Sequence, residues 1–248
     1  MEVQLSEFQK LIVPQFLSGE IIRVVESQEQ IATLQLVDNF DEQLLLEEMI
    51  DNSKPPLSAS TSGLHYLLST PFRYPPLKHG SRFGTKNSPG LFYASNTIAT
   101  AFTETAFYRF MFIHALKEVF PKKSVTQHTA FTAKYRTNKG LKLHGDKFIS
   151  YQQQLREAED YSFTQELGAL LRDNNIEAFE FFSARTKKDE INTALFSPKC
   201  FSVSSPTRQT QWICETTSEQ VSYYSSESNQ IYCFKLESFY KDGQLPFV

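Results

Sequence analysis

The chain has 248 residues and a net charge of −3, and 40% of its residues are hydrophobic, with 22 Phe and 11 Tyr among them. This length allows one large domain or two small ones with a buried core, and the 9 Gly and 11 Pro exclude collagen-like and low-complexity classes. No segment approaches the run of about 18 apolar residues that spans a membrane. Acidic residues stand near the start, where an export signal would carry lysines, so we expect a cytoplasmic protein without a membrane partner.

The first 60 residues are acidic, and we expect them to form a partly helical N-terminal extension. In DEQLLLEEMI, Asp41 can cap a helix that places its leucines and Met49 on one packing face. Residues 51–63 are rich in Ser, Pro and Gly, which predicts a loop. We therefore place the main domain at residues 61–248.

The stretch 71–90 holds four Pro and three Gly, which predicts a long ordered loop or short strands joined by turns. Loops of this length inside a compact domain tend to be functional. Residues 91–95 predict a buried strand. Residues 96–120 predict a helix whose N-cap is Asn96 or Thr97.

The rest of the chain mixes helical and strand patterns. Residues 151–175 predict a helix that stops at two asparagines. Alternating apolar residues and turn signals predict strands at 128–137, 176–184, 191–203 (two short strands around Pro198), 202–228 (surface strands or loops) and 231–239. The expected fold class is therefore α+β, with no internal repeat.

Charge is distributed unevenly along this weakly acidic chain. The balance of charged residues is −8 over residues 1–60, +10 over residues 61–150 and −5 over residues 151–248. A basic middle third favours an anionic ligand, unless its charges only pair with the acidic flanks. Direct nucleic-acid binding is not favoured, because no continuous Lys/Arg stripe is present. A small phosphorylated ligand fits better, since a few arginines suffice to bind a diphosphate.

One carboxylate stands out in the helix predicted after Tyr93. Between Thr97 and Phe112 the only charged residues are Glu104 and Arg109, and the helix is apolar nearly all round, which predicts burial. Helical spacing places Arg109 too far around the helix to pair with Glu104. A buried carboxylate needs a partner. It either pairs with a loop arginine such as Arg73 or Arg82, or it lines a cleft and binds ligand hydroxyls.

Several common site motifs are absent from the sequence. No Gly-rich dinucleotide or phosphate loop and no nucleophile elbow occurs. Cys200, Cys214 and Cys233 have no CxxC spacing, and the five histidines form no HExxH motif. We therefore expect no disulfide framework, no metal and no resident cofactor.

The stretch GSRFGTKNSPGLFYASNTIATAFTETAFYRF resembles the RES domain family, named for its Arg, Glu and Ser. Arg82 in GSRFG, Tyr93 in FYAS and Glu104 in TAFTE match the family pattern in order. FEFFSAR supplies the late serine, Ser183, with Phe182 where the family commonly has Pro. The resemblance covers about residues 70–200, and Arg23 in IIRVV is similar to an early arginine of the family.

The resemblance implies an ADP-ribosyltransferase-like mixed sheet core with flanking helices. It also implies a toxin of a toxin–antitoxin pair that consumes NAD as its substrate, with a cognate helix-turn-helix antitoxin as a partner. Such enzymes split the nicotinamide–ribose bond and pass ADP-ribose to phosphate or water. A homodimer is possible, but the sequence does not determine the oligomeric state.

The same resemblance assigns expected roles to individual residues. Glu104 would stabilise the cationic ribose and hold its hydroxyls, and Tyr93 would flank the nicotinamide ring. Arg82 would hold the diphosphate, so Glu104, Arg82 and Tyr93 are the expected catalytic residues.

Three further residues are expected to bind substrate. Ser183 would donate a hydrogen bond to phosphate or ribose, and Arg73 or Arg185 would assist Arg82 at the diphosphate. Three of the expected site residues also have a structural alternative: Tyr93 as core, Ser183 as a backbone partner, and Arg82 as the ion-pair partner of Glu104. Two rival functions remain, namely an ADP-ribosyltransferase that modifies a protein and an inactive or nucleic-acid-binding module with the same fold.

Overall fold

The computed structural model describes residues 2–27, 36–56, 58–74, 76, 78–116 and 123–246. Its α-helices are α1 (Glu2–Gln9), α2 (Phe40–Ser53), α3 (Tyr66–Arg73), α4 (Ile98–Ala115), α5 (Gln152–Leu155) and α6 (Ser162–Asp173). Its strands are β1 (Gln15–Glu26), β2 (Phe92–Ser95), β3 (Ser124–Lys142), β4 (Ala178–Phe182), β5 (Ile191–Leu195), β6 (Arg208–Thr216), β7 (Gln220–Ser225) and β8 (Gln230–Lys235). The predicted α+β class is confirmed.

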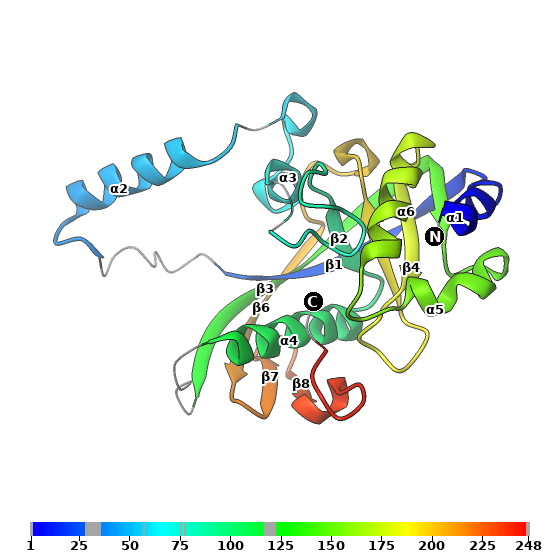
Figure 1. The fold of residues 1–248 in the computed structure, drawn as a ribbon. Coiled ribbons are helices and arrows are strands. Elements are labelled where there is room, and N and C mark those ends of the chain that lie inside the picture. The colour runs from blue at the N-terminus through cyan, green and yellow to red at the C-terminus, as the bar shows by residue number, and fades with distance from the viewer. Residues whose placement is uncertain are drawn as a thin grey trace.

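The strands form one mixed sheet in the order β1-β2-β5-β4-β3-β6-β7-β8. Strand β1 also pairs with β3, which closes the first five strands into a ring, and β6 to β8 continue from β3 as an antiparallel meander. The β3–β4 pair is parallel and the other pairs are antiparallel. Helix α4 lies along the strands on one side, and α6 lies beside β4 (Figure 1).

The N-terminal segment differs from the expected helical layer. Strand β1 lies between β2 and β3, and its pairing with β3 runs from Gln15 to Glu26. Its apolar residues Leu17 and Ile21 are buried in the core. The apolar alternation of QFLSGEIIRVVE is therefore a strand signal that the sequence analysis missed. The domain boundary near residue 61 stays a prediction.

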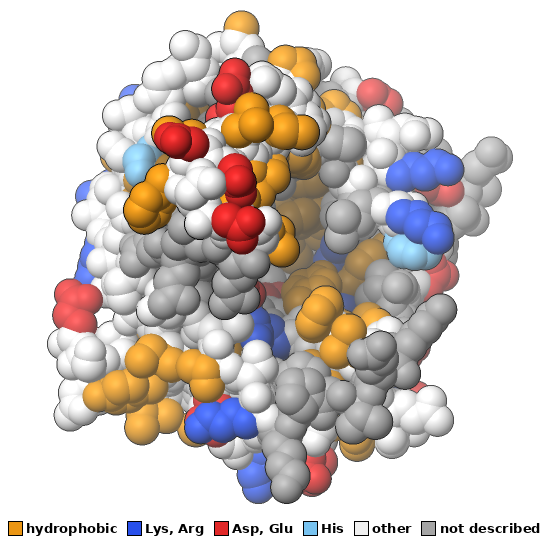
Figure 2. Space-filling model, turned by 90° about the vertical axis from the view of Figure 1, so that its left-hand side faces the viewer, with side chains coloured by type: hydrophobic (Ala, Val, Ile, Leu, Met, Phe, Trp, Pro, Cys, Tyr) orange, Lys and Arg blue, Asp and Glu red, His pale blue; other side chains and the backbone are white. Residues whose placement is uncertain are grey.

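Helix α2 was expected to pack its leucines and Met49, and this expectation is wrong. The helix projects from the rest of the molecule (Figure 1), and the exposed fractions of Leu44 and Met49 are 70% and 61%. Its N-cap is Asn39, whose side chain accepts from the backbone N–H of Glu42 at 2.9 Å, and Asp41 lies inside the first turn. The face that carries this projection is hollowed, with many hydrophobic side chains in the hollow (Figure 2).

Several other predicted elements are confirmed with changed bounds. The predicted strand at 91–95 is β2, and the helix after it is α4 with Thr97 as its N-cap. Residues 117–122 of that predicted helix lie outside the described residues. The second strand expected after Pro198 is wrong, because a short 3-10 helix, Pro198–Cys200, replaces it. The helix predicted at 151–175 is divided into α5 and α6.

Helix α4 is fixed to the sheet by Arg109. Its guanidinium donates from Nε to Thr216 Oγ1 at 2.7 Å and pairs through Nη1 with Glu26 at 3.2 Å. The predicted absence of an Arg109–Glu104 pair is thereby explained, since Arg109 is engaged by β1 and β6. One face of α4, including Phe102 and Phe107, is fully buried, whereas Phe112 on the other side is exposed. The helix is thus buried on one face only.

Close packing also fixes the loop that precedes β2. Gly168 lies inside α6, and a Cβ atom at this position would collide with the backbone carbonyl of Phe83. The ring of Phe83 is buried between Phe179 and Phe181 of β4, at centroid distances of 4.7 and 4.8 Å. Helix α6 therefore presses the loop around Phe83 against the sheet.

We predict that Gly168→Ala destabilises the protein, although the same change inside a helix usually stabilises by up to about 1 kcal/mol. The added methyl group would displace the Phe83 backbone, and overpacking of this kind costs about 1–3 kcal/mol. Chemical denaturation of the variant and of the control Ala169→Gly, at the exposed neighbouring position of α6, measures both effects. An increase in the free energy of unfolding of Gly168→Ala would contradict the packing described.

A second prediction concerns His128 of β3, whose exposed fraction is 2% and whose Nε2 lies 3.0 Å from Thr126 Oγ1. Burial, and secondly the charge of Arg109, lower the pKa of His128 to about 4. Between pH 6.5 and 4, His128 therefore binds a proton in the unfolded chain but remains neutral in the folded chain. Stability should fall by up to about 3 kcal/mol between pH 6.5 and 4 from this group. Denaturation measured at several pH values in this range should give a free energy of unfolding that depends less on pH for His128→Gln than for the wild type. An equal pH dependence in the two proteins would contradict the lowered pKa of His128.

Candidate active site

The Glu104 carboxylate lies where α4 faces the ends of β4 and β5. Its Oε1 accepts a hydrogen bond from Ser183 Oγ at 2.6 Å and another from Asn192 Nδ2 at 2.6 Å. Glu104 is partly buried. Among the described residues no hydrogen-bond donor reaches Oε2, so the protein fixes one carboxylate oxygen and leaves the other without a donor.

Asn192 is held in place by the sheet itself. It pairs with Ser95 of β2 and with Phe181 of β4, so it lies in the central strand of three. Ser95 Oγ donates to Asn192 Oδ1 at 2.6 Å, and this orients the amide so that its Nδ2 points to Glu104. Because Ser95 and Asn192 are both buried, the carboxylate is oriented through a short chain of buried hydrogen bonds.

Ser183 follows β4 directly and connects Glu104 to Arg185. Its Oγ donates to Glu104 and accepts from the backbone N–H of Arg185 at 3.0 Å. The Arg185 guanidinium lies 3.6 Å from the centroid of the Phe107 ring of α4 and donates from Nη2 to Tyr161 Oη at 2.6 Å. The structure therefore brings the predicted residues Glu104, Ser183 and Arg185 together.

Arg82 lies in the same region as Glu104 but makes no direct hydrogen bond to it. Its Nη2 donates to the backbone carbonyl of Leu155, and its guanidinium lies 5.2 Å from the Phe181 ring centroid. Burial lowers the pKa of Arg82, and the nearby Glu104 carboxylate acts in the opposite direction. The expected alternative of a direct Arg82–Glu104 ion pair is thus not what the structure shows.

Tyr93 supports the turn that carries Arg82. Its hydroxyl accepts from the backbone N–H of Phe83 at 2.9 Å and lies 3.1 Å from Ser81 Oγ. Burial raises the pKa of Tyr93 to about 12, so the hydroxyl keeps its proton near neutral pH. Its contact with nicotinamide stays a prediction, whereas its hydroxyl already has a structural role.

Two other arginines singled out in the sequence are engaged elsewhere. Arg73, at the end of α3, donates from Nε to the carbonyl of Pro55 and lies 6.0 Å from the Tyr74 ring centroid. Arg23 of β1 donates to the Tyr93 carbonyl at 3.4 Å, and burial lowers its pKa to about 10. Among the described contacts, none joins Arg73 to Glu104, Ser183 or Arg185.

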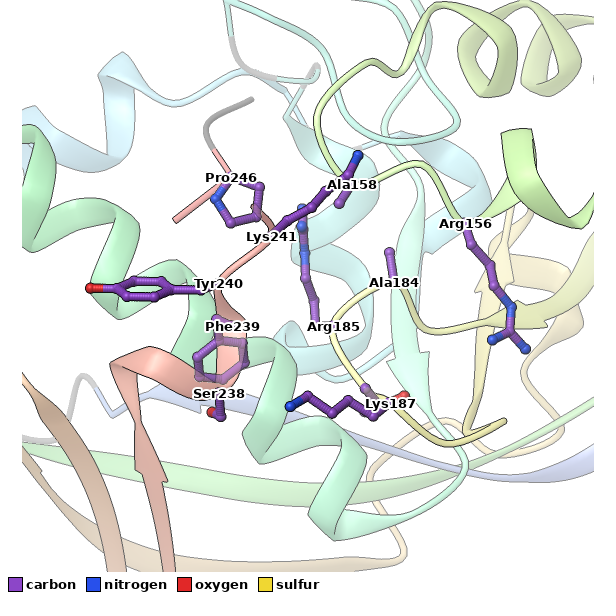
Figure 3. A pocket seen from close by; sticks show the side chains of 11 residues that line it. Arg156, Ala158, Ala184, Arg185, Lys187, Ser238, Phe239, Tyr240, Lys241 and Pro246 are labelled. Atoms are coloured by element: carbon purple, nitrogen blue, oxygen red, sulfur yellow. The ribbon is translucent and has the colours of Figure 1, made fainter. Parts of the chain in front are cut away.

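A cavity of about 220 Å³ adjoins this cluster on the side of Arg185. Arg185 projects from the loop after β4 toward Lys241 of the C-terminal segment, and both line the cavity (Figure 3). Glu104 and Arg82 are not among its lining residues. The cavity therefore reaches the candidate site through Arg185.

Two residues of the site, Asn192 and Ser95, were not predicted from the sequence. Asparagine is depleted in strands, so an asparagine in the apolar run INTALF could have indicated a functional position. The structure shows no group of three or more His, Cys, Asp or Glu side chains that could hold a metal within the ranges it describes. In the same ranges, no helix combines the length and hydrophobicity needed to cross a membrane.

A comparison with known families matches more than half of the chain. The model of the RES domain matches residues 57–215, which include Arg82, Tyr93, Glu104 and Ser183, and no curated protein matches the chain. A RES domain suggests an NAD-related, toxin-like function and a possible antitoxin partner. Since the match covers more than half of the sequence, the chain belongs to the RES domain family.

Proposed function

We propose that the protein degrades NAD by cleaving the bond between nicotinamide and ribose and passing ADP-ribose to phosphate or water. The observation that carries this proposal is the Glu104 carboxylate, fixed through Oε1 by Ser183 and Asn192. A carboxylate held in this way is suited to a sugar that becomes positively charged during the reaction.

Departure of nicotinamide defines what the site must stabilise. When the bond between the pyridine nitrogen and ribose C1 breaks, its electron pair goes to nicotinamide and the positive charge moves to the ribose. Glu104 Oε2 would face this charge and accept a hydrogen bond from a ribose hydroxyl. An oxygen of phosphate or water then bonds to C1, and with water a proton is released. Because Oε1 is already fixed, the carboxylate does not need to reorient during the reaction.

Arg82 and Arg185 would supply the positive charge for the diphosphate. Arg185 is connected to Glu104 through Ser183, and Arg82 is close enough for the Glu104 charge to affect its pKa. A guanidinium binds phosphate oxygens with two parallel hydrogen bonds. Tyr93 would then flank the nicotinamide end.

We also propose a cognate helix-turn-helix antitoxin that covers this site.

We predict that Glu104→Gln folds normally but cleaves NAD about 10²- to 10³-fold more slowly. The amide oxygen can still accept from Ser183 and Asn192, whereas the negative charge that faces the ribose is lost. Nicotinamide release by the pure protein is the measurement, and Glu166→Gln, at an exposed position of α6, is the matched control. Turnover of Glu104→Gln at the wild-type rate would remove the carboxylate from the mechanism.

We predict that Arg82→Gln weakens NAD binding about 10- to 100-fold, as expected for the loss of a charge-assisted contact. Arg172→Gln is the control, because Arg172 also donates to a backbone carbonyl, that of Pro89, and stacks on a ring, that of Phe196. Calorimetric titration with NAD, with each change made in the slowly cleaving Glu104→Gln protein, gives both affinities, and thermal unfolding verifies the fold. Equal affinities with and without Arg82→Gln would assign the diphosphate to other residues.

The rival function is transfer of ADP-ribose to a protein, which would use the same residues. Incubation of the protein with labelled NAD and a cell lysate separates the two. Label in small-molecule products supports NAD degradation, and label on a protein band supports transfer.

A further inference from the structure

Three segments line the cavity beside Arg185. Arg156 and Ala158 precede α6, residues 184–187 form the loop after β4, and residues 238–241 with Pro246 belong to the C-terminal segment (Figure 3). The C-terminal segment lies outside residues 57–215, which match the family. The cavity is therefore completed by a part of this chain that lies beyond the RES domain.

The described residues that line this cavity include four cationic side chains and no acidic one. Two of the cations are paired with carboxylates outside the cavity. Arg156 contacts Asp189, and Lys241 pairs with Glu157 at 2.9 Å and with Glu159 at 3.6 Å. Arg185 and Lys187 have no such partner among the described residues, so two positive charges are left uncompensated at the cavity.

Arg185 carries the strongest indication of a ligand. Its exposed fraction is 8%, its Nη2 donates to the neutral Tyr161 hydroxyl, and its Nη1 is buried with no acceptor among the described residues. A buried guanidinium is normally hydrogen-bonded on every side that faces polar groups. An anion in the cavity would supply both the acceptor for Nη1 and the missing negative charge.

We propose that this cavity binds a phosphoryl group. The volume of about 220 Å³ holds several water molecules, so a phosphate or a diphosphate fits. Two uncompensated cations, one of them a guanidinium, match the charge and the multiple oxygens of a phosphoryl group better than they match a single carboxylate. Arg185 and Lys187 would bind the group from the loop after β4, and Lys241 lines the cavity from the C-terminal segment.

The source of the phosphoryl group depends on the function proposed above. Arg185 donates its backbone N–H to Ser183, and Ser183 donates to Glu104, so the cavity is one residue removed from the reacting carboxylate. A phosphoryl group bound there is either free phosphate that accepts ADP-ribose or the diphosphate of the dinucleotide. In both cases the C-terminal segment contributes to the site.

The direct test is calorimetric titration of the full chain with inorganic phosphate, in the absence of NAD. We expect Lys187→Ala to weaken phosphate binding about tenfold, the usual effect of one charge-assisted contact. Lys188→Ala is the matched control, because it removes the same charge from the same exposed loop but does not line the cavity. Lys241→Met, in the C-terminal segment, should also weaken binding.

Titration with ADP-ribose, alone and against bound phosphate, separates the two sources. Competition between the two ligands assigns the cavity to the diphosphate, and simultaneous binding assigns it to free phosphate. Equal phosphate affinities of Lys187→Ala and Lys188→Ala, or no phosphate binding by the wild type, would overturn the proposal. Neither titration requires NAD cleavage. A protein that binds phosphate in this cavity but does not cleave NAD would therefore contradict the proposed function and leave the phosphoryl site standing.

Discussion

The site depends on two hydrogen bonds to one oxygen of Glu104. The donors, Ser183 and Asn192, come from the end of β4 and from β5, while the carboxylate comes from α4. The interaction therefore joins a helix to two adjacent strands. A carboxylate oriented before the substrate arrives stabilises developing positive charge without reorganisation, which is why this arrangement suits cleavage of a glycosidic bond to a cationic base.

The rest of the fold serves to keep these three side chains in place. Arg109 fixes α4 to β1 and β6, and Ser95 fixes the amide of Asn192 across the sheet. On the other side, the close contact of Gly168 with Phe83 and the Tyr93 hydroxyl hold the turn that presents Arg82. Arg82 is thus carried on a turn that packing holds in place, which lowers the cost of ordering its side chain when an anion binds.

Much of this arrangement could be predicted from the sequence. The family was indicated by the charge of Glu104 in an apolar helix and by the order of the Arg, Tyr, Glu and Ser positions. Three residues named from the sequence, Glu104, Ser183 and Arg185, are brought together by the structure. Long-range pairing could not be predicted, because it depends on which strands become neighbours. Asn192 belongs to the site only through its place between β2 and β4. For the same reason the position of β1 inside the sheet was missed, and Arg73 was expected near a carboxylate that it does not contact.

The C-terminal segment shows the limit of family resemblance. It lies beyond residues 57–215, yet it lines the cavity that Arg185 shares with the candidate site.

Mass analysis of the products formed when the pure protein meets NAD, with and without phosphate, decides whether the protein cleaves NAD. We expect free nicotinamide together with ADP-ribose or its phosphate ester. Intact NAD after prolonged incubation with the folded wild-type protein would contradict this expectation.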